Sequence, residues 1–484
     1  MQLRRTWGVA LLALAPLTAP HAQSAGSSDT AALQKKLDEQ EQRLKVLERK
    51  LELNDEAAQA AAQSTAVAKA GPSGFSIQSA DGANVVRLKG NLAVDGRYFI
   101  DSTTPVTADT WLLRNVRPTI EGTLNGIYDF RFTPEFGGGR SYILDAYVAA
   151  RFRPWFVVQA GKFKGPVGLE RLQGDGDVRF VERGYPSNLL PNRDIGLQVS
   201  GDVWGGRLSY AVGYFDGTLD GKNTDNNTNA DVDVDGRRDW AGRLFAQPFL
   251  QSDNFYLRGL GFGIGGSYTN SSSTADKTVP GPTNTLLTTY VTTGQQSVFG
   301  FRSNTATGTA PNNATYADGK RLRWSPQAYY YVGSFGVLGE YAVVSQDVSR
   351  QVSATVTRSD TVDIKAWQVA TYFFLTGEEE TYRGTVVPNS NFAIGKPGWG
   401  AFELVARYNR LDIDDAAFAG GANSFANATS AVRRASAYDI GATWYLNRNV
   451  KWLLNYELTK FDGGAASGDR GDEKVLLTRF YLQF

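Results

Sequence analysis

The sequence predicts an all-β transmembrane barrel of about 16 antiparallel strands, preceded by a short N-terminal coiled-coil helix. Short segments of alternating polarity recur from about Val85 onward, tight turns mostly alternate with long polar loops, and the last strand runs to an aromatic residue, Phe484. Alternation gives each strand one apolar and one wet face. Together these three features are typical of a barrel with lipid outside and water inside.

The first 22 residues have the pattern of a secretory signal. Arg4 and Arg5 form a basic start, an apolar run spans Val9–Leu14, and small residues lead to a cleavage site near Ala22. That run is too short to cross a membrane as a helix. We therefore expect an exported protein without a helical anchor.

Composition excludes several kinds of chemistry. The sequence contains Cys 0, His 1 and Met 1, and both His21 and Met1 lie in the expected signal. Without Cys or His there is no thiol or imidazole nucleophile, no Ser-His triad and no His or Cys metal site. We predict no enzyme, metal or cofactor, although a hydrolase that uses carboxylates alone stays compatible. A net charge of +1 gives no reason to expect nucleic acid as a partner.

Residues 23–62 are predicted to form the helix. Leucines recur at alternating spacings of four and three, with two polar residues and one alanine in the same seam: Leu33, Leu37, Gln40, Leu44, Leu47, Leu51, Asn54 and Ala58. A seam of about three heptads needs partner helices to be stable. We expect it to join protomers into a homo-oligomer, a trimer; the alternative is a lone amphipathic helix. Residues 63–83, which include Gly71-Pro72-Ser73-Gly74, read as a linker before a barrel domain at 84–484.

Strands are expected near 85–100, 109–123, 127–136, 141–152, 155–164, 193–204, 206–216, 238–249, 254–269, 321–333, 335–347, 360–375, 399–412, 433–446, 449–461 and 473–484. Long loops are expected at 165–192, 217–237, 270–320, 413–432 and 462–472, with tight turns on the other side. Such asymmetry is the pattern of the bacterial outer membrane, with lipid and lipopolysaccharide around the barrel and both chain ends, including the helix, in the periplasm. The connection 377–398 is long although it falls on the turn side.

Strand parity assigns many arginines to the wet faces: Arg87, Arg97, Arg151, Arg153, Arg193, Arg207, Arg243, Arg321, Arg323, Arg407 and Arg479. Acidic residues such as Asp95, Asp145, Glu403 and Glu457 are interleaved. One interpretation is an ordinary polar, ion-paired lumen. The other is a track that guides anions, because guanidinium binds phosphate and carboxylate bidentately and a narrow lumen focuses its field.

The segment 165–192 is too apolar to extend into water, since it contains Leu169, Phe180, Val181, Leu189 and Leu190. It is predicted to fold into the barrel and narrow the pore. Its position, with that of the flanking strands, nominates six basic residues for the constriction: Lys162, Lys164, Arg171, Arg179, Arg183 and Arg193.

The same segment carries a family resemblance. Ala160–Arg171 (AGKFKGPVGLER) and Phe180–Gly196 (FVERGYPSNLLPNRDIG), with Leu375–Glu378, Gly398–Leu404 and Ala406–Tyr408, resemble the phosphate- and polyphosphate-selective porins, the O/P porins. The resemblance spans essentially the whole barrel. It implies a sixteen-stranded trimeric barrel, an inward-folded third loop, an anion pathway lined by Arg and Lys, and a periplasmic position for the 377–398 connection.

The predicted function is passive diffusion of small anions, phosphate or polyphosphate, through an Arg- and Lys-lined pore. Two alternatives stay open. Few basic residues occur in 270–320, and acids stand beside the nominated constriction (Glu170, Asp175, Asp177 and Glu182), which favours a general small-solute porin. A structural barrel tethered by its coiled coil is the other alternative.

One further motif starts like a calcium loop. Asp231-Val232-Asp233-Val234-Asp235-Gly236 has the D-x-D-x-D-G spacing, but Gly242 stands where an EF-hand has glutamate. A solvated acidic loop is the default interpretation, and calcium capture is the alternative.

Overall fold

The computed structural model describes residues 27–71, 74–100, 108–139, 141–217, 236–272, 285–307, 312–353 and 355–484. The chain divides into two compact units, Met1–Thr65 and Ala66–Phe484. The expected signal and residues 231–235 of the acidic motif lie outside the described residues. The signal and the calcium alternative therefore stay predictions.

The first unit contains one helix, α1 (Ser27–Ser64), over the region predicted to be helical. Every leucine of the predicted seam is at least 55% exposed, from Leu37 at 55% to Leu33 at 67%. Ion pairs such as Arg43–Glu39 (3.2 Å) and Arg49–Glu52 (2.9 Å) lie along the helix surface. No helix in the described part of the chain is both long enough and apolar enough to span a membrane. Pairing of α1 with other helices stays a prediction.

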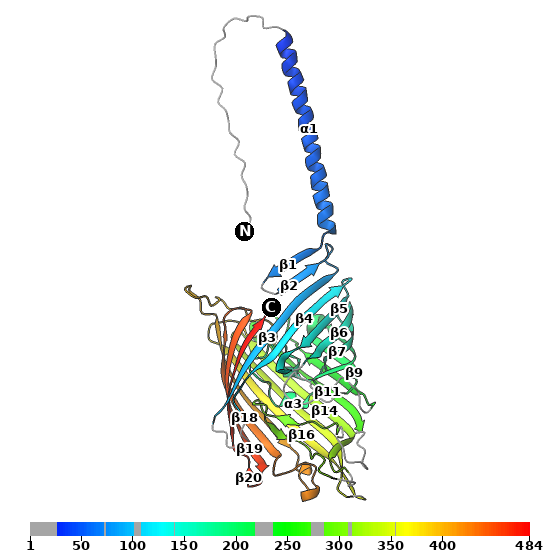
Figure 1. Cartoon of the computed structure of the whole chain (residues 1–484), viewed down its shortest axis with the longest axis vertical. Helices are drawn as coiled ribbons and strands as arrows, with labels where there is room; N and C mark the ends of the chain where they lie inside the picture. Colours follow the sequence, from blue (N-terminus) through cyan, green and yellow to red (C-terminus); the bar gives the residue numbers. More distant parts are fainter. Residues whose placement is uncertain are drawn as a thin grey trace. The chain divides into compact units, whose positions relative to one another are not determined.

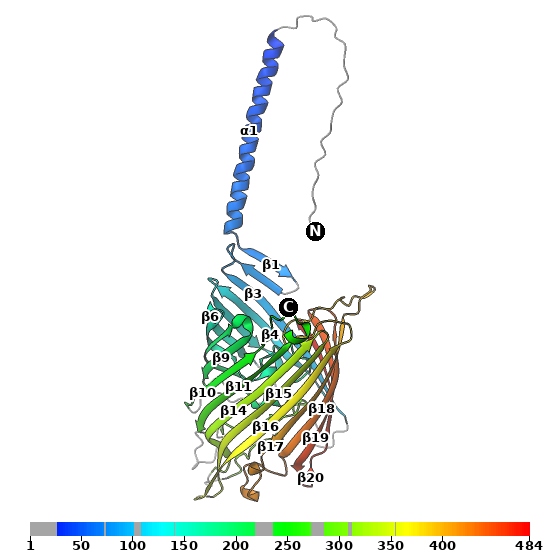
Figure 2. The ribbon, with the colours of Figure 1, turned by 180° about the vertical axis from the view of Figure 1, so that it is seen from behind.

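The second unit is a closed barrel of sixteen strands among the described residues (Figure 1). These are β3 (Val85–Phe99), β4 (Thr110–Leu124), β5 (Tyr128–Glu135), β6 (Tyr142–Arg153), β7 (Phe156–Lys164), β8 (Arg193–Val203), β9 (Leu208–Phe215), β10 (Asp239–Ala246), β11 (Leu260–Ser272), β14 (Thr315–Val332), β15 (Phe335–Gln351), β16 (Thr357–Phe374), β17 (Ala401–Ile413), β18 (Val432–Tyr445), β19 (Val450–Ala465) and β21 (Glu473–Gln483). Each pairs antiparallel with the next, as the far side of the barrel shows for β10 to β19 (Figure 2). The ring closes where β21 pairs with β3, with Arg479 opposite Asp95. The predicted fold class is confirmed.

Strand β19 shows why the alternation forms a barrel wall. Leu454 is 39% exposed on the outside, whereas its neighbour Leu453 is 1% exposed on the inside. The inward set also includes Asn455, Glu457 and Thr459, all at most 1% exposed. An apolar outer face meets lipid without desolvating polar groups, and the inner face collects the polar side chains.

Several segments differ from the sequence predictions. The expected linker 63–83 contains β1 (Val67–Gly71) and β2 (Gly74–Gln78), which pair with each other while β2 also pairs with β3. Gly74 has a φ of 100°, which favours glycine, and Phe75 and Ile77 alternate with polar residues. The expected strand 254–269 begins instead with α4 (Phe255–Arg258), because the Asn254 side chain accepts a hydrogen bond from the Tyr256 N–H. Strand β20 (Gly468–Asp469) pairs with the end of β19, inside the predicted loop 462–472.

Two connections fill part of the interior. Residues 165–192 contain α2 (Leu169–Leu172) and α3 (Pro186–Leu189), and Phe180 and Leu190 are at most 1% exposed. The predicted polar loop 270–320 contains β12 (Tyr290–Val291) and β13 (Ser297–Phe299), in which every residue except Ser297 is buried. Four 3₁₀ turns complete the described elements: Gly137–Gly139, Trp204–Gly206, Asp415–Ala417 and Gly421–Asn423.

Candidate functional site

The candidate site is the barrel interior around residues 165–192, hereafter the inner loop. Inward-facing side chains of three strands hold its backbone. The N–H groups of Leu169 and Glu170 donate to the two carboxylate oxygens of Glu340 at 2.6 and 3.3 Å. The Tyr185 N–H donates to Asn409 (3.2 Å), and the Val181 N–H donates to Asn455 (2.9 Å). Strands β15, β17 and β19 therefore fix the inner loop inside the barrel.

Arg407 is one ionic link between the inner loop and the wall. Its guanidinium contacts Glu170 at 3.3 Å, Asp439 at 2.9 Å and Glu457 at 3.8 Å. It also lies 4.2 Å from the centre of the Phe180 ring. Because it is buried and surrounded by carboxylates, Arg407 acts as a structural cation at this point.

The long turn-side connection between β16 and β17 also reaches the inner loop. The Tyr382 hydroxyl donates to the Leu169 carbonyl at 2.7 Å, and the Gly384 N–H donates to Asp177 at 3.0 Å. Arg179 lies between Glu380 (3.4 Å) and Glu403 of β17 (3.3 Å). Burial raises the pKa of Glu380 to about 9; Arg179 opposes this shift and Glu403 adds to it. The sequence showed only that this connection was unusually long for a turn.

A second cluster lies where β3, β4 and β21 meet the inner loop. Glu182 pairs with Arg97 and with Arg114, both at 3.0 Å, and Arg479 lies 3.9 Å away. Arg479 makes a bidentate pair with Asp95 at 2.7 and 2.8 Å. Burial raises the pKa of Glu182, but Arg114, Arg97 and Arg479 together bring it below its ordinary value. Glu182 is therefore ionised at neutral pH.

A cavity of about 620 Å³ opens at the turn side of the barrel, hereafter the vestibule. The turn residues Arg448 and Asn449 and the terminal residues Gln483 and Phe484 line it. Among its described lining residues, eight are basic and three are acidic: Lys69, Arg87, Lys89, Arg117, Arg131, Lys164, Arg193 and Arg448 against Asp145, Asp175 and Asp177. The vestibule therefore has an excess of positive charge.

The six nominated constriction residues lie in different places. Lys164 and Arg193 line the vestibule, and Arg193 pairs with Asp145 at 2.7 Å. Arg183 lies beside Asp175 at 3.3 Å, in a small cavity next to the vestibule. Arg171 and Arg179 are buried within the packing of the inner loop, where Arg171 donates to the Ser187 carbonyl. Lys162 is buried on β7.

The predicted arginine track is divided by ion pairs. Arg321 and Arg323 of β14 share Asp239 of β10, at 2.9 and 2.5 Å. Arg243 donates to Gln327 at 2.8 Å, and Arg151 donates to Asp129 at 3.1 Å. Of the remaining predicted positions, Arg87 lines the vestibule, Arg97 and Arg479 belong to the Glu182 cluster, and Arg407 contacts the inner loop. Arg153 lies at a tight turn, where it donates to the Phe152 carbonyl. Arg207 follows the 3₁₀ turn Trp204–Gly206.

Sequence reasoning missed Arg114, Arg117, Arg131 and Lys451. The ammonium of Lys451 donates to the Gly176 and Val178 carbonyls of the inner loop at 2.8 and 3.1 Å. A register shift between Ala93 and Val94 places an extra residue in β4, so Arg114 and its neighbour Asn115 are both buried inside. Simple period-two counting assigns these two neighbours to opposite faces. Arg117 and Arg131 could have been found by continuing the alternation through β4 and β5.

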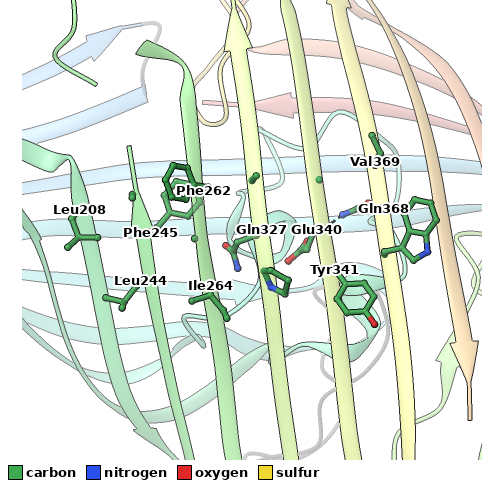
Figure 3. A pocket seen from close by; sticks show the side chains of 16 residues that line it. Leu208, Leu244, Phe245, Phe262, Ile264, Gln327, Glu340, Tyr341, Gln368 and Val369 are labelled. Atoms are coloured by element: carbon green, nitrogen blue, oxygen red, sulfur yellow. Dashed lines mark hydrogen bonds between the residues drawn. The ribbon is translucent and has the colours of Figure 1, made fainter. Parts of the chain in front are cut away.

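Another cavity, of about 1010 Å³, lies on the outside of the barrel wall over β9 to β16 (Figure 3). Leu244, Phe262 and Ile264 line it and are 47–54% exposed. Its exposed apolar lining belongs to the lipid-facing surface, and the inward-facing strand residues Gln327, Glu340 and Gln368 also border it. No group of three or more residues that could hold a metal occurs in the described part of the chain.

The chain is similar to one known protein family and to several solved structures. The family described as phosphate-selective porin O and P matches residues 86–484. Among solved structures, the outer membrane channel DcaP of Acinetobacter baumannii is similar at 10% identity, over 86% of this chain and 99% of that chain, with a TM-score of 0.50. In-vitro folded OmpT of Vibrio cholerae is similar at 13% identity, over 82% of this chain and 98% of that chain, with a TM-score of 0.48. The anion-selective porin from Comamonas acidovorans is similar at 12% identity, over 83% of this chain and 100% of that chain, with a TM-score of 0.45. At such identities the likeness concerns the fold alone. No curated protein matches the chain.

Proposed function

Because this chain belongs to the phosphate-selective porin O and P family, we propose that its outer-membrane barrel lets small anions, phosphate or polyphosphate among them, diffuse passively through its interior. The family is one of channels, so the barrel is a porin rather than an enzyme. The preferred anion and the route through the interior are the parts that we propose.

The vestibule is the single observation that carries the proposal. Eight Lys or Arg and three Asp line a cavity of about 620 Å³ at one mouth of the barrel. A concave surface of one predominant charge raises the local concentration of the opposite ion. Guanidinium groups also match the oxygens of phosphate in pairs. This mouth is therefore suited to collecting anions.

We propose a route from the vestibule past the inner loop. Arg117 and Asp175 line both the vestibule and the small cavity that holds Arg183 and Glu182. In this route the inner loop forms the constriction, and carboxylates beside each basic residue keep every binding step weak. Conduction requires such weak sites in series, since a strong site would trap the ion.

One observation favours the second candidate, a porin for small solutes in general. The interior arginines nearest the inner loop are paired with carboxylates, such as Arg97 with Glu182 and Arg407 with Asp439. Paired charges attract a passing anion less than single ones. Comparing phosphate with an uncharged solute of similar size in a vesicle-swelling assay separates the two candidates.

We also propose that the turn side faces the periplasm and that α1 joins protomers into a trimer there. The exposed leucine seam of α1 supports a partner of the same kind, because a helix this long with an exposed apolar stripe gains stability by pairing. The barrel would be surrounded by outer-membrane lipid and lipopolysaccharide. Mass measurement of the detergent-solubilised full chain tests this, and a monomer at every concentration would contradict it.

Charge reversal tests the proposed function. We expect Lys164→Glu and Arg183→Glu each to shift the zero-current potential in a KCl gradient towards cation passage, because both remove positive charge from the proposed route. Arg258→Glu is the matched control, since Arg258 lies in α4 on the same side but does not line the vestibule. Equal potentials for all three variants and the unmodified protein would remove these residues from the pathway.

A further inference from the structure

We propose that Glu182 is a built-in competitor for the permeating anion: its carboxylate occupies an arginine site, and an anion of the phosphate class must displace it to pass. The proposal rests on the proposed function and adds the residue that sets the anion affinity of the constriction. A carboxylate and a phosphate make the same kind of charge-assisted hydrogen bond to guanidinium, so the two compete directly.

The geometry is that of an anion already bound. Oε1 of Glu182 accepts from Arg97 at 3.0 Å and from Arg114 Nε at 3.0 Å, and Oε2 accepts from Arg114 at 3.2 Å. Glu182 is 4% exposed, and Arg97 and Arg114 are 8% and 6% exposed. Both carboxylate oxygens are used, in a place nearly closed to solvent.

The site keeps a donor that Glu182 does not use. Nε of Arg97 is buried and has no hydrogen-bond partner among the described residues. A phosphate group offers three strongly accepting oxygens, one more than a carboxylate. Phosphate could therefore use donors that the Glu182 side chain leaves over.

The charges of the cluster favour an added anion once Glu182 leaves. Arg97, Arg114 and Arg479 face Asp95 and Glu182, so three positive groups oppose two negative ones. Asp95 is held by Arg479 in a bidentate pair and is 0% exposed on β3. Without the charge of Glu182, three arginines would face one carboxylate.

The position of the cluster places it on the proposed route. Glu182, Arg114 and Arg479 line the small cavity that shares Arg117 and Asp175 with the vestibule. That cavity has a volume of about 10 Å³, which is roughly the space for one water molecule. An anion therefore has no room there while the Glu182 side chain is in place.

Displacement requires only the side chain to move. The backbone is fixed on both sides of Glu182, by the Val181 N–H to Asn455 at 2.9 Å and the Gly184 N–H to Glu170 at 2.9 Å. Rotation of a glutamate between its staggered rotamers leaves these bonds intact. The inner loop can thus stay in place while the arginine site changes occupant.

The expected effect follows from occupancy. If the Glu182 carboxylate holds the site for more than half of the time, the site is open to an incoming anion for less than half of the time. The apparent dissociation constant of the anion is then the intrinsic constant divided by the fraction of time for which the site is open. Removing the competitor should then lower the half-saturating concentration of phosphate by at least about two-fold.

The experiment uses the full chain in planar bilayers, with inorganic phosphate as the probe added to a chloride solution. Glu182→Gln keeps the shape and removes the charge; Glu182→Asp keeps the charge. We expect Glu182→Gln to lower the phosphate concentration that half-blocks chloride current at least two-fold, and Glu182→Asp to change it less. Asp239→Asn is the matched control, because it removes one buried carboxylate that is shared by two arginines, Arg321 and Arg323, away from the Glu182 cluster.

The outcomes separate this inference from the proposed function. An equal shift for Glu182→Gln and Asp239→Asn, or no shift for either in a protein that prefers anions, overturns the competitor role while the function stands. If the unmodified protein shows no anion preference but Glu182→Gln gains one and is blocked by phosphate, the competitor role stands and the proposed function fails. If phosphate blocks neither protein, both fail.

Discussion

Glu340 offers a direct test of what holds the inner loop in the barrel. It accepts the N–H groups of Leu169 and Glu170 at 2.6 and 3.3 Å, and both residues are buried. Glu340→Ala would remove both bonds. A hydrogen bond to a charged group contributes about 1.5–3 kcal/mol, the longer bond contributes less, and water entering the interior offsets part of the loss. We expect a net loss of about 1.5–3 kcal/mol of loop anchoring.

Every 1.4 kcal/mol is a factor of ten in an equilibrium constant, so detachment of the inner loop should become about 10- to 100-fold more frequent. Single-channel recording should then show transient steps of higher conductance that are absent from the unmodified protein. The control is Glu121→Ala, because Glu121 pairs with Lys89 and Arg131 on neighbouring strands. Steady, unchanged conductance in a folded Glu340→Ala barrel would refute this anchoring role.

Two other predictions follow from the wall and from the turn-side connection. Leu454→Arg places a charge on the lipid-facing side of β19 and should lower the free energy of unfolding by about 2–4 kcal/mol near the bilayer centre. Urea titration in lipid measures this loss, with Leu454→Met as the control. A change below about 0.5 kcal/mol would contradict the assigned face. The pKa of Glu380 lies above its ordinary value in the folded protein, so the buried neutral form stabilises the 375–400 connection at low pH, and this stability is lost as pH rises from about 5 through about 9. Conductance should therefore rise at alkaline pH in the unmodified protein and stay flat in Glu380→Gln, and identical pH profiles would exclude Glu380 as the cause.

The wall could be predicted from the sequence because side chains along a lipid-facing strand alternate between an apolar outer face and a polar inner face. Trp452 and Leu454 face outward and Asn455 and Glu457 face inward, as their alternation indicates. Where this alternation is interrupted, prediction fails: the extra residue at Arg114 changes the parity of β4. The hairpin of β1 and β2 was missed because Gly71 and Gly74, which permit a tight hairpin, are equally common in linkers.

The interior could be predicted only in part. The apolar residues of the inner loop indicated that it is buried, and this depends on composition alone. Which basic residues pair with which acids depends on contacts between distant segments, such as Arg97 with Glu182 or Arg407 with Glu170. Such pairs have no local signature, so the sequence suggested a track of arginines where the structure has several ion-paired clusters and one basic vestibule.

The basic vestibule should make the barrel interior pass anions in preference to cations. The most direct measurement is the zero-current potential of the unmodified, full-length protein in a planar bilayer with a salt gradient, first with KCl and then with potassium phosphate on one side. We expect a potential of the sign produced by anion flow in both salts. A potential of the opposite sign, or a reconstituted barrel that conducts no ions at all, would contradict it.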